Sequence, residues 1–460
     1  MNKYDVIVIG AGASGVFLSY ELTKLENKAT VLMLDKGAPL ESRACPIKLG
    51  KTETCIKCNP CHIMSGYGGA GTLSDGKYNI TTEFGGDLHS YVGVDHALEL
   101  MEYVDQVLCN MGRSEAKLYS TGNSDLRRLA LQNNLKLLDA KVRHLGTDRN
   151  FQILQKMFDY SKDRVEIKFY TTVEKVNVLE DGSFQLITNK GDEYFCDNLV
   201  MATGRSGSKW NGEVCEKLGI GQKNNRVDIG VRVELPAVIF KHITDDVYES
   251  KLVYKTDKYN DMVRTFCMNP YGEVVAENTN GIVTVNGHSY ADPSLRTENT
   301  NFALLVSNNF TEPFRDSNEY GESIARLSNM LGGGVLLQRF GDLVKGRRSS
   351  ERRMAKCFTR PTLKATPGDL SLVIPKRQLD NIIEMIYALD KIAPGTANED
   401  TLLYGVEVKF YNSKVEVDYN LETSIKNFYV LGDGSGVTHS LSQASASGVL
   451  VGRILAEKYQ

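Results

Sequence analysis

Short apolar runs rich in β-branched residues recur along the chain, and runs of this kind predict buried strands of a parallel sheet. The first run, residues 4–9, is followed by a glycine-rich stretch at 10–15. A helical pattern with leucines on one face extends over 14–25, and a second apolar run, 29–34, ends at Asp35. The order strand, glycine loop, helix, strand and acid predicts a dinucleotide-binding unit.

The glycine stretch reads Gly-Ala-Gly-Ala-Ser-Gly, a G-x-G-x-x-G pattern. Its first glycine permits a tight turn, its second lets the backbone approach a pyrophosphate, and its third lets helix and strand pack closely. The N–H groups that open the helix would hold the phosphates, and the acid after the second strand would bind ribose hydroxyls. The contacts predicted here are those of Gly10, Gly12, Ala13, Ser14, Gly15, Asp35 and Lys36.

The C-terminal part of the chain indicates which dinucleotide is bound. The apolar run 427–431 precedes Gly432-Asp433-Gly434, and a carboxylate at this place is the usual partner of the ribityl chain of FAD in such folds. A helical pattern dense in small residues follows over 440–457. We expect this helix to lie close against the sheet, with its N-terminal end toward the flavin pyrimidine ring. The contacts predicted from this part are those of Gly432, Asp433 and Ser442.

A third buried run, 198–204, ends in Ala-Thr-Gly, as in the segment where FAD-binding folds return to the cofactor. Strand patterns near 165–178, 183–188 and 193–196 precede it and predict a small β-meander. Each pattern alone is also compatible with an ordinary turn, but their order favours FAD over NAD as the tightly bound nucleotide. The contacts predicted here are those of Val173, Ala202, Thr203 and Gly204.

A segment with an unusual density of cysteine and glycine lies at residues 37–77. Its cysteines, Cys45, Cys55, Cys58 and Cys61, allow three interpretations. They are an iron–sulfur ligand set such as that of a [4Fe-4S] cluster, a structural zinc site, or a redox dithiol. The glycine stretch that follows has no strand before it, so it is not a second nucleotide-binding unit. We expect this loop to lie along the pyrophosphate and ribityl chain of FAD, with contacts from Gly71, Ser74 and Asp75; the alternative is a plain flexible loop.

From residue 207 the pattern changes to alternating strands between Gly, Asn and Pro turns, which predicts a mostly antiparallel second domain. The predicted fold is α/β, a Rossmann-type FAD-binding domain of the glutathione-reductase-like kind with a second, antiparallel β substrate domain. The FAD-binding domain would comprise 1–206, with a helical insertion at about 90–160, and would resume at 361–460 after a substrate domain at 207–360. An amphipathic helix at 378–392 and a hairpin at 403–417 are expected near this return.

Three residues are candidates for catalysis, namely Cys267, His288 and His439, with a structural role as the alternative for the first two. His439 stands just before the terminal helix and is the first candidate for proton transfer. A basic run, Arg347 to Arg360, is either a solvated face or an anion site for NAD(P)H phosphate, an acidic substrate or an acidic electron carrier.

Composition agrees with a large enzyme. The chain has 460 residues and a net charge of −3, and it has no apolar run of membrane-spanning length. The balanced charge argues against nucleic-acid binding. The first strand begins too early for a signal peptide to precede it, so a cytoplasmic location is expected. In a reducing compartment the nine cysteines are thiols, metal ligands or redox groups before they are structural disulfides.

Five motifs carry a resemblance to a known family: GAGASG, CxxCxxC followed by GYGGAGTLSDGKYN, VDIGVRVE, RTFCMNPYGEVV and VLGDGSG. Together they resemble a bacterial family of FAD-dependent, or NAD(FAD)-utilising, dehydrogenases, over nearly the whole chain. The resemblance implies FAD bound at Gly10, Gly12, Gly15, Asp35, Asp75 and Asp433.

The sequence therefore predicts an FAD-dependent oxidoreductase that acts on a small-molecule substrate. Without a second nucleotide-binding unit, NAD(P)H would bind only transiently. Two alternatives are a flavin and iron–sulfur protein that works with a ferredoxin-like electron carrier, and a tRNA-modifying flavoprotein. No membrane partner is expected.

Overall fold

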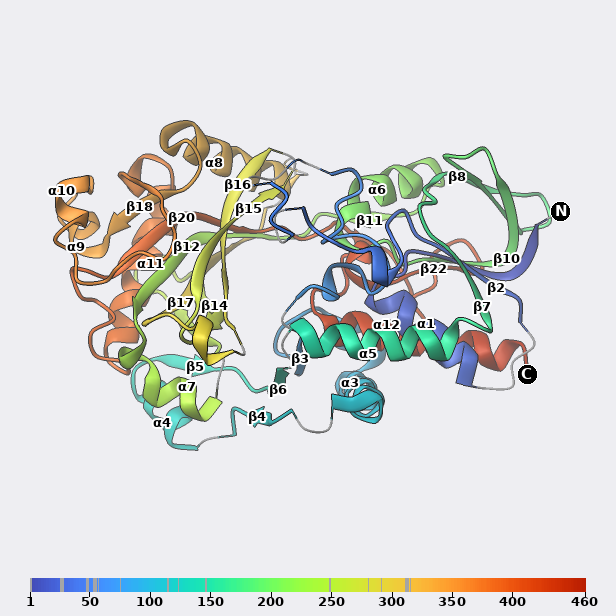
Figure 1. The fold of residues 1–460 in the computed structure, drawn as a ribbon, viewed down its shortest axis with the longest axis horizontal. Coiled ribbons are helices and arrows are strands. Elements are labelled where there is room, and N and C mark those ends of the chain that lie inside the picture. The colour runs from blue at the N-terminus through green and yellow to red at the C-terminus, as the bar shows by residue number, and fades with distance from the viewer. Residues whose placement is uncertain are drawn as a thin grey trace. The chain divides into compact units, whose positions relative to one another are not determined.

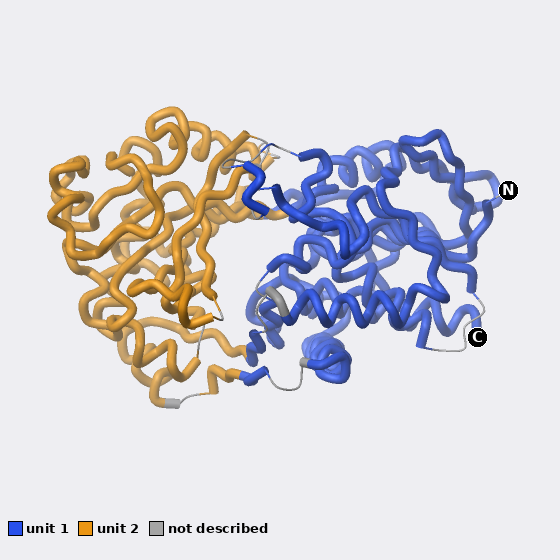
Figure 2. The backbone as a smooth tube through the Cα atoms, in the orientation of Figure 1, with its two compact units in different colours: residues 1–118, 141–225, 412–460 blue, residues 119–140, 226–411 orange. Residues whose placement is uncertain are grey.

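The computed structural model describes residues 2–24, 29–46, 49–52, 56, 58–74, 76–113, 116–122, 124–144, 147–247, 250–279, 281–290, 292–310, 314 and 316–460. The chain forms two compact units (Figure 2). The first unit contains residues 1–118, 141–225 and 412–460, and the second contains 119–140 and 226–411.

A mostly parallel sheet forms the centre of the first unit, in the order β7-β2-β1-β10-β9-β8, with β22 also paired to β10 (Figure 1). Its strands are β1 (Lys3–Ile9), β2 (Val31–Leu34), β7 (Val165–Lys168), β8 (Val173–Val178), β9 (Phe184–Thr188), β10 (Glu193–Met201) and β22 (Phe428–Val430). Strands β8 and β9 form the antiparallel part, as the predicted meander requires. The parallel strands β2 and β22 are fully buried, because apolar side chains occupy both of their faces.

Helices and two small strand pairs complete the first unit. The helices are α1 (Ala13–Lys24), α2 (His89–Val92), α3 (Val94–Leu108), α5 (Thr147–Ser161), α6 (Ser208–Lys217) and α12 (Leu441–Lys458). The strand pairs are β3 (Lys77–Ile80) with β6 (Lys141–His144), and β11 (Gln222–Lys223) with β21 (Lys414–Val415). The described residues contain no helix that is both long enough and apolar enough to cross a membrane.

An antiparallel sheet in the order β19-β18-β20-β12-β17-β14-β13-β5 forms the centre of the second unit, with only β18 and β19 parallel to each other. Its strands are β5 (Leu135–Leu137), β12 (Val227–Pro236), β13 (Leu252–Lys255), β14 (Met262–Asn269), β17 (Asn299–Asn308), β18 (Leu336–Arg339), β19 (Thr366–Pro367) and β20 (Leu402–Lys409). A separate hairpin consists of β15 (Glu273–Thr279) and β16 (Ile282–His288). The helices are α4 (Ser124–Gln132), α7 (Lys241–Val247), α8 (Ser317–Gly332), α9 (Phe340–Val344), α10 (Glu351–Met354) and α11 (Lys376–Asp390).

The structure confirms a mixed α/β fold, but local elements differ from the predicted ones. The two strands expected at 193–196 and 198–204 are one strand, β10, because β1 pairs with it on both sides of Asp197. The hairpin expected at 403–417 is wrong. Strand β20 pairs with β12 and β18, whereas β21 pairs with β11 in the first unit.

The division into units also differs from the predicted domain boundaries. Residues 361–411 belong to the second unit, because α11 and β20 pack on its sheet, and residues 207–225 belong to the first. The insertion at 90–160 is not wholly helical, since it contains β5, β6 and β4 (Leu118–Ser120). Residues 119–140 of this insertion belong to the second unit.

Candidate dinucleotide-binding site

The end of β1 and the start of α1 pack against β10 without intervening side chains. Gly10 has a φ of +107°, a conformation that favours glycine, and its N–H donates to the carbonyl oxygen of Leu34 at 2.8 Å. A Cβ on Gly10 would overlap the carbonyl oxygen of Ala202, and a Cβ on Gly15 would overlap that of Gly10. The predicted Ala202 therefore lies directly beside the glycine loop.

Gly12 stands in a different environment from the two other glycines of the motif. Among the described residues, the only atom within 4 Å of a Cβ built on Gly12 is the carbonyl oxygen of Ala202, at 4.0 Å. The first turn of α1 begins here, since the N–H of Val16 donates to the carbonyl oxygen of Gly12 at 2.9 Å. Open space next to the N–H groups of a helix N-terminus fits a pyrophosphate.

Asp35 holds the glycine loop from the end of β2. Its Oδ2 accepts from the backbone N–H of Ala11 at 2.8 Å, and its Oδ1 accepts from that of Gly37 at 2.7 Å. An ionised carboxylate has further lone pairs on both oxygens, so it can still accept a ribose hydroxyl. Thr171, just before β8, donates its N–H to the carbonyl oxygen of Asp35 at 2.9 Å. This bond brings the start of β8, with Val173, close to Asp35.

The neighbouring Lys36 turns toward the segment after β10. Its Nζ donates to the carbonyl oxygen of Ser206 at 3.1 Å. Burial lowers its pKa. Thr203 in the same segment donates its hydroxyl to Asn211 Oδ1 at 2.8 Å, and Asn211 Nδ2 donates to the carbonyl oxygen of Gly434 at 3.1 Å. Asn211 thus joins the Ala-Thr-Gly segment to the C-terminal motif, a role that no sequence pattern indicated.

The C-terminal motif lies against the N-terminal one. A Cβ on Gly432 would overlap Ser14 Oγ, and a Cβ on Gly448 of α12 would overlap the carbonyl oxygen of Ser14. The small residues of α12 therefore permit a close approach to α1, in addition to the predicted packing against the sheet. The Asp433 carboxylate accepts from Arg205 Nε at 3.3 Å and lies on a short helix, Gly432–Ser435.

The hydroxyl of Ser442, in the first turn of α12, is buried and has no hydrogen-bond partner among the described residues. The cap of this helix is the neighbouring Ser440, whose side chain accepts from the N–H of Gln443. A buried hydroxyl without a partner is uncommon, so this position fits contact with a bound group.

The glycine loop that follows the cysteines lies on the Gly10–Gly12 turn. The N–H of Gly68 donates to the carbonyl oxygen of Ala11 at 2.7 Å. Asn150, from α5, donates to the carbonyl oxygen of Gly71 at 2.7 Å, and Ser74 Oγ donates to the same oxygen at 2.6 Å. The two predicted contacts Gly71 and Ser74 therefore lie in one fixed loop. Asp75 lies outside the described residues.

Arg43, which no sequence pattern indicated, fixes this loop. Its side chain is buried, and among the described residues it donates to backbone carbonyl oxygens and to one hydroxyl but to no carboxylate. The acceptors are His62 O (3.0 Å), Ile63 O (2.7 Å), Tyr67 O (2.7 Å), Gly69 O (2.8 Å) and Thr72 Oγ1 (2.6 Å). Burial lowers the pKa of Arg43 to about 10. An arginine two residues before a cysteine carries no sequence signal for this role.

The three predicted catalytic residues are divided between the two units. His439 belongs to the first unit, where its N–H donates to the carbonyl oxygen of Gly85 at 2.9 Å. Cys267 and His288 belong to the second unit. Cys267 has a φ of +44°, which is strained for a side chain with a Cβ, and His288 pairs with Glu273 at the end of the β15–β16 hairpin.

A buried charged network holds the backbone at Cys267. Arg232 of β12 is fully buried and donates to the carbonyl oxygen of Cys267 at 2.7 Å and to Asn301 Oδ1 at 2.9 Å. Its Nη1 also contacts both oxygens of Glu407, at 3.0 and 3.2 Å. Burial outweighs this pairing and raises the pKa of Glu407 to about 7.

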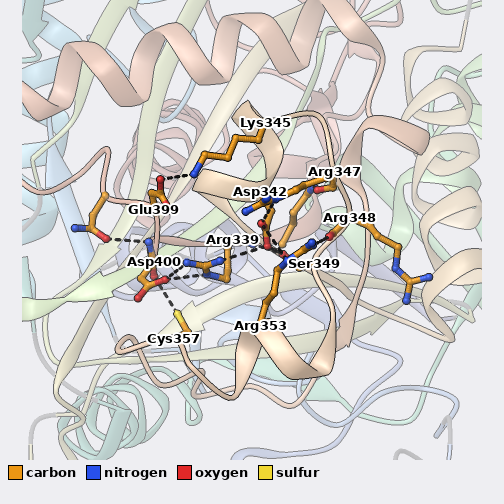
Figure 3. A network of polar contacts seen from close by, with 12 residues as sticks. Arg339, Asp342, Lys345, Arg347, Arg348, Ser349, Arg353, Cys357, Glu399 and Asp400 are labelled. Atoms are coloured by element: carbon orange, nitrogen blue, oxygen red, sulfur yellow. Dashed lines mark hydrogen bonds and ion pairs between the residues drawn. The ribbon is translucent and has the colours of Figure 1, made fainter.

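Two arginines of the basic run at 347–360 contact the buried carboxylate of Asp342, so this part of the run has a structural role (Figure 3). Arg347 Nε donates to Asp342 Oδ1 at 2.7 Å, and Ser349 Oγ donates to Asp342 Oδ2 at 2.8 Å. Arg339 and Arg353 lie close to the same buried carboxylate, at 3.5 and 3.8 Å. Although burial opposes ionisation, these partners lower the pKa of Asp342. The remaining cations of the run are exposed, namely Arg348, Arg352, Lys356 and Arg360.

The described cysteines do not form a metal site. Cys45, Cys58 and Cys61 are free thiols, and the described residues contain no group of three ligating side chains that could hold a metal ion. Cys55, the fourth predicted ligand, lies outside the described residues. The pattern of spacings alone could not show whether the thiols meet.

Comparison with known proteins gives one family match, within the second unit. Residues 227–410, less than half of the chain, match a family described as "FAD-dependent protein, C-terminal domain-like". No curated protein sequence matches the chain.

Similar solved structures include a glycine oxidase and an L-proline dehydrogenase. A glycine oxidase from Geobacillus kaustophilus is 11% identical, with 100% of this chain and 96% of that chain covered and a TM-score of 0.43. An L-proline dehydrogenase from P. horikoshii is 13% identical, with 100% and 95% covered and a TM-score of 0.43. These identities and TM-scores are too low to carry an inference about this chain.

Proposed function

We propose that this protein is an FAD-dependent oxidoreductase whose first unit is a glutathione-reductase-like FAD-binding domain. The observation that carries the proposal is the contrast within the glycine motif. Gly10 and Gly15 are closed by neighbouring backbone, whereas Gly12 faces open space at the start of α1. The family match of the second unit to FAD-dependent proteins supports the same cofactor.

The residues around Gly12 have separate roles in holding FAD. The N–H groups at the start of α1 would bind the pyrophosphate, Asp35 would bind the adenosine ribose, and Asp433 would bind the ribityl chain. The start of β8, near Val173, would contact adenine through its backbone. When bound, FAD supplies the acceptor and donor of hydride or electrons.

The finer parts of the proposal concern the substrate and its proton. We propose a small-molecule substrate, with NAD(P)H as a transient partner. His439 is the first candidate to hold or move a proton, because it belongs to the unit that carries the nucleotide motif. The ferredoxin-like carrier, the tRNA substrate, the metal cluster and the cytoplasmic location stay predictions, since no observation above favours them.

The first experiment is an ultraviolet–visible spectrum of the anaerobically purified protein, before and after addition of NADH or NADPH. We expect a flavin spectrum that a nicotinamide bleaches. A protein that stays colourless after incubation with FAD would contradict the cofactor. A flavin that neither nicotinamide reduces would contradict only NAD(P)H as the electron donor.

The role of His439 is tested separately. His439→Gln should slow turnover of an identified substrate by about 10²-fold or more, as expected for loss of a general acid or base, while the flavin content stays unchanged. Unchanged turnover would remove His439 from the mechanism without affecting the assignment of FAD.

A further inference from the structure

A small pocket in the first unit has two thiols in its wall. Its volume is about 230 Å³, and its lining includes Gly37, Ala38, Cys58, Cys61, His62 and Tyr170. The two cysteines are separated by two residues, the spacing of redox-active dithiols, and both are free thiols. Cys61 is exposed and Cys58 is half-buried, so small molecules can reach them from solution.

Three of the six other described cysteines stand in environments that suppress reaction. Cys196, Cys215 and Cys357 are buried. Burial raises the pKa of Cys196, and it raises the pKa of Cys215 and of Cys357 to about 11. Because the thiolate is the reactive form, these three thiols are inert near neutral pH. Cys58 and Cys61, which we call the pocket pair, therefore differ from these three cysteines both in their exposure to solvent and in their surroundings.

The wall behind the pocket pair is fixed and carries a positive charge. The buried guanidinium of Arg43 donates to the carbonyl oxygens of His62 and Ile63, directly after Cys61. The guanidinium of Arg43 therefore holds the backbone that directly follows Cys61 in place.

The pocket also contains a group that can take a proton. Among the residues that the structure describes, the buried Nδ1 of His62 has no hydrogen-bond partner. The imidazole lines the same pocket as the two thiols, although its Nδ1 makes no hydrogen bond to either of them. Two accessible thiols therefore line one pocket, and two thiols suffice to reduce a disulfide by thiol–disulfide exchange.

We propose that Cys58 and Cys61 reduce a small disulfide bound in this pocket. The exposed Cys61 thiolate attacks one sulfur of the disulfide, forms a mixed disulfide and releases the first thiolate. The Cys58 thiolate then attacks Cys61 Sγ, forms the Cys58–Cys61 disulfide and releases the second thiolate. The two cysteines lose two electrons and two protons, and the small disulfide becomes two thiols.

This activity goes beyond the proposed flavin chemistry and does not depend on it. The proposed flavin chemistry assigns no step to either thiol, and the readout below is independent of flavin content. Failure of one proposal therefore leaves the other standing.

The test uses the full chain as purified, reduced with dithiothreitol and freed of it, with 2-hydroxyethyl disulfide as the probe. We expect two equivalents of mercaptoethanol per chain and a Cys58–Cys61 linkage by peptide mass spectrometry. Cys58→Ser should stop at a mixed disulfide on Cys61. Cys61→Ser should react at least about 10-fold more slowly at this pocket, because its first nucleophile is gone.

Cys45→Ser is the matched control, because Cys45 is a half-buried free thiol outside the described lining of the pocket. It should form the Cys58–Cys61 linkage at the wild-type rate. A linkage that involves Cys45 or Cys55 instead would overturn the proposal. So would stoichiometric zinc or iron in the purified protein that protects both pocket thiols from the probe.

Discussion

The two units bury their polar groups in opposite ways. In the first unit the candidate site is made of backbone, with glycines where a Cβ would overlap a carbonyl oxygen and one glycine, Gly12, that faces open space. In the second unit β12 buries whole charged side chains, Asp228, Arg232 and Glu234, on one face of its sheet. A site made of backbone depends on the absence of side chains, whereas a buried network depends on every partner being present.

The opposite face of β12 explains how the second unit tolerates this network. Val227, Ile229, Val231 and Val233 alternate with the charged residues and belong to the apolar core. Tyr404 and Thr362 donate to Glu234 at 2.5 and 2.6 Å, so its carboxylate is satisfied. Buried charges are costly unless paired and hydrogen-bonded, and here the pairing is nearly complete.

The largest effect is expected in the second unit, from Arg232→Met. The substitution leaves Glu407 buried without its guanidinium partner, so the free energy of unfolding should fall by about 3–5 kcal/mol. Urea denaturation measures this fall in the free energy of unfolding. The double variant Arg232→Met with Glu407→Leu should recover much of the loss, because both charges are removed. A double variant no more stable than the single one would contradict the explanation from charge pairing.

A smaller loss is expected in the first unit from Gly15→Ala, whose Cβ would overlap the carbonyl oxygen of Gly10. Overpacking of this kind should lower the free energy of unfolding by about 1–3 kcal/mol and also reduce FAD content. Gly12→Ala is the matched control, since its Cβ meets no overlap in the protein. It should lose FAD while the FAD-free protein keeps wild-type stability within about 0.5 kcal/mol. Equal stability losses in the two variants would contradict the contrast between the glycines.

The pH dependence of stability should be changed by Asp342→Asn. The folded-state pKa of Asp342 is lowered, so its stabilisation is present above the unfolded pKa near 3.8 and is lost as pH falls through the folded value. At neutral pH the variant should be less stable by about 1.5–3 kcal/mol, the range for hydrogen bonds to a charged group. The difference should shrink steadily in denaturation measured at acid pH. A constant difference at all pH values would contradict a charged Asp342.

The smallest effect is expected from Arg205→Gln, because Arg205 is half-exposed and pairs with Asp433 at 3.3 Å. Exposed ion pairs contribute little, so the free energy of unfolding of the FAD-free protein should change by less than about 1 kcal/mol. Thermal unfolding of the FAD-free variant measures this. A loss as large as that of Gly15→Ala would show that this ion pair holds the site together.

The backbone-made site could be predicted from the sequence because glycines at fixed spacing are a local pattern. The turn at Gly10 and the close packing at Gly15 follow from residues only a few positions apart. The partners that hold the site are distant in sequence. Asn211 joins Thr203 to Gly434 through hydrogen bonds. Arg43 donates hydrogen bonds to the carbonyl oxygen of Tyr67 and to those of nearby residues. Neither residue type indicates such a role by itself.

In the second unit the strands could be predicted, but the meaning of their polar positions could not. The alternation in β12 indicates a strand, and its charged residues would ordinarily be read as the solvent face. Burial of that face depends on partners such as Glu407 and Tyr404, far along the chain. Likewise, the basic run did not indicate that Asp342, which precedes its first arginine, forms ion pairs with three guanidinium groups.

The contact of Gly432 and Gly448 with Ser14 has a consequence for biosynthesis. On the ribosome, the first strand, the glycine loop and α1 emerge hundreds of residues before the segment that completes their surroundings. The nascent chain must therefore keep this early segment unaggregated until α12 has been released from the exit tunnel. The surroundings of the glycine loop are therefore complete only in chains whose synthesis has run through to α12.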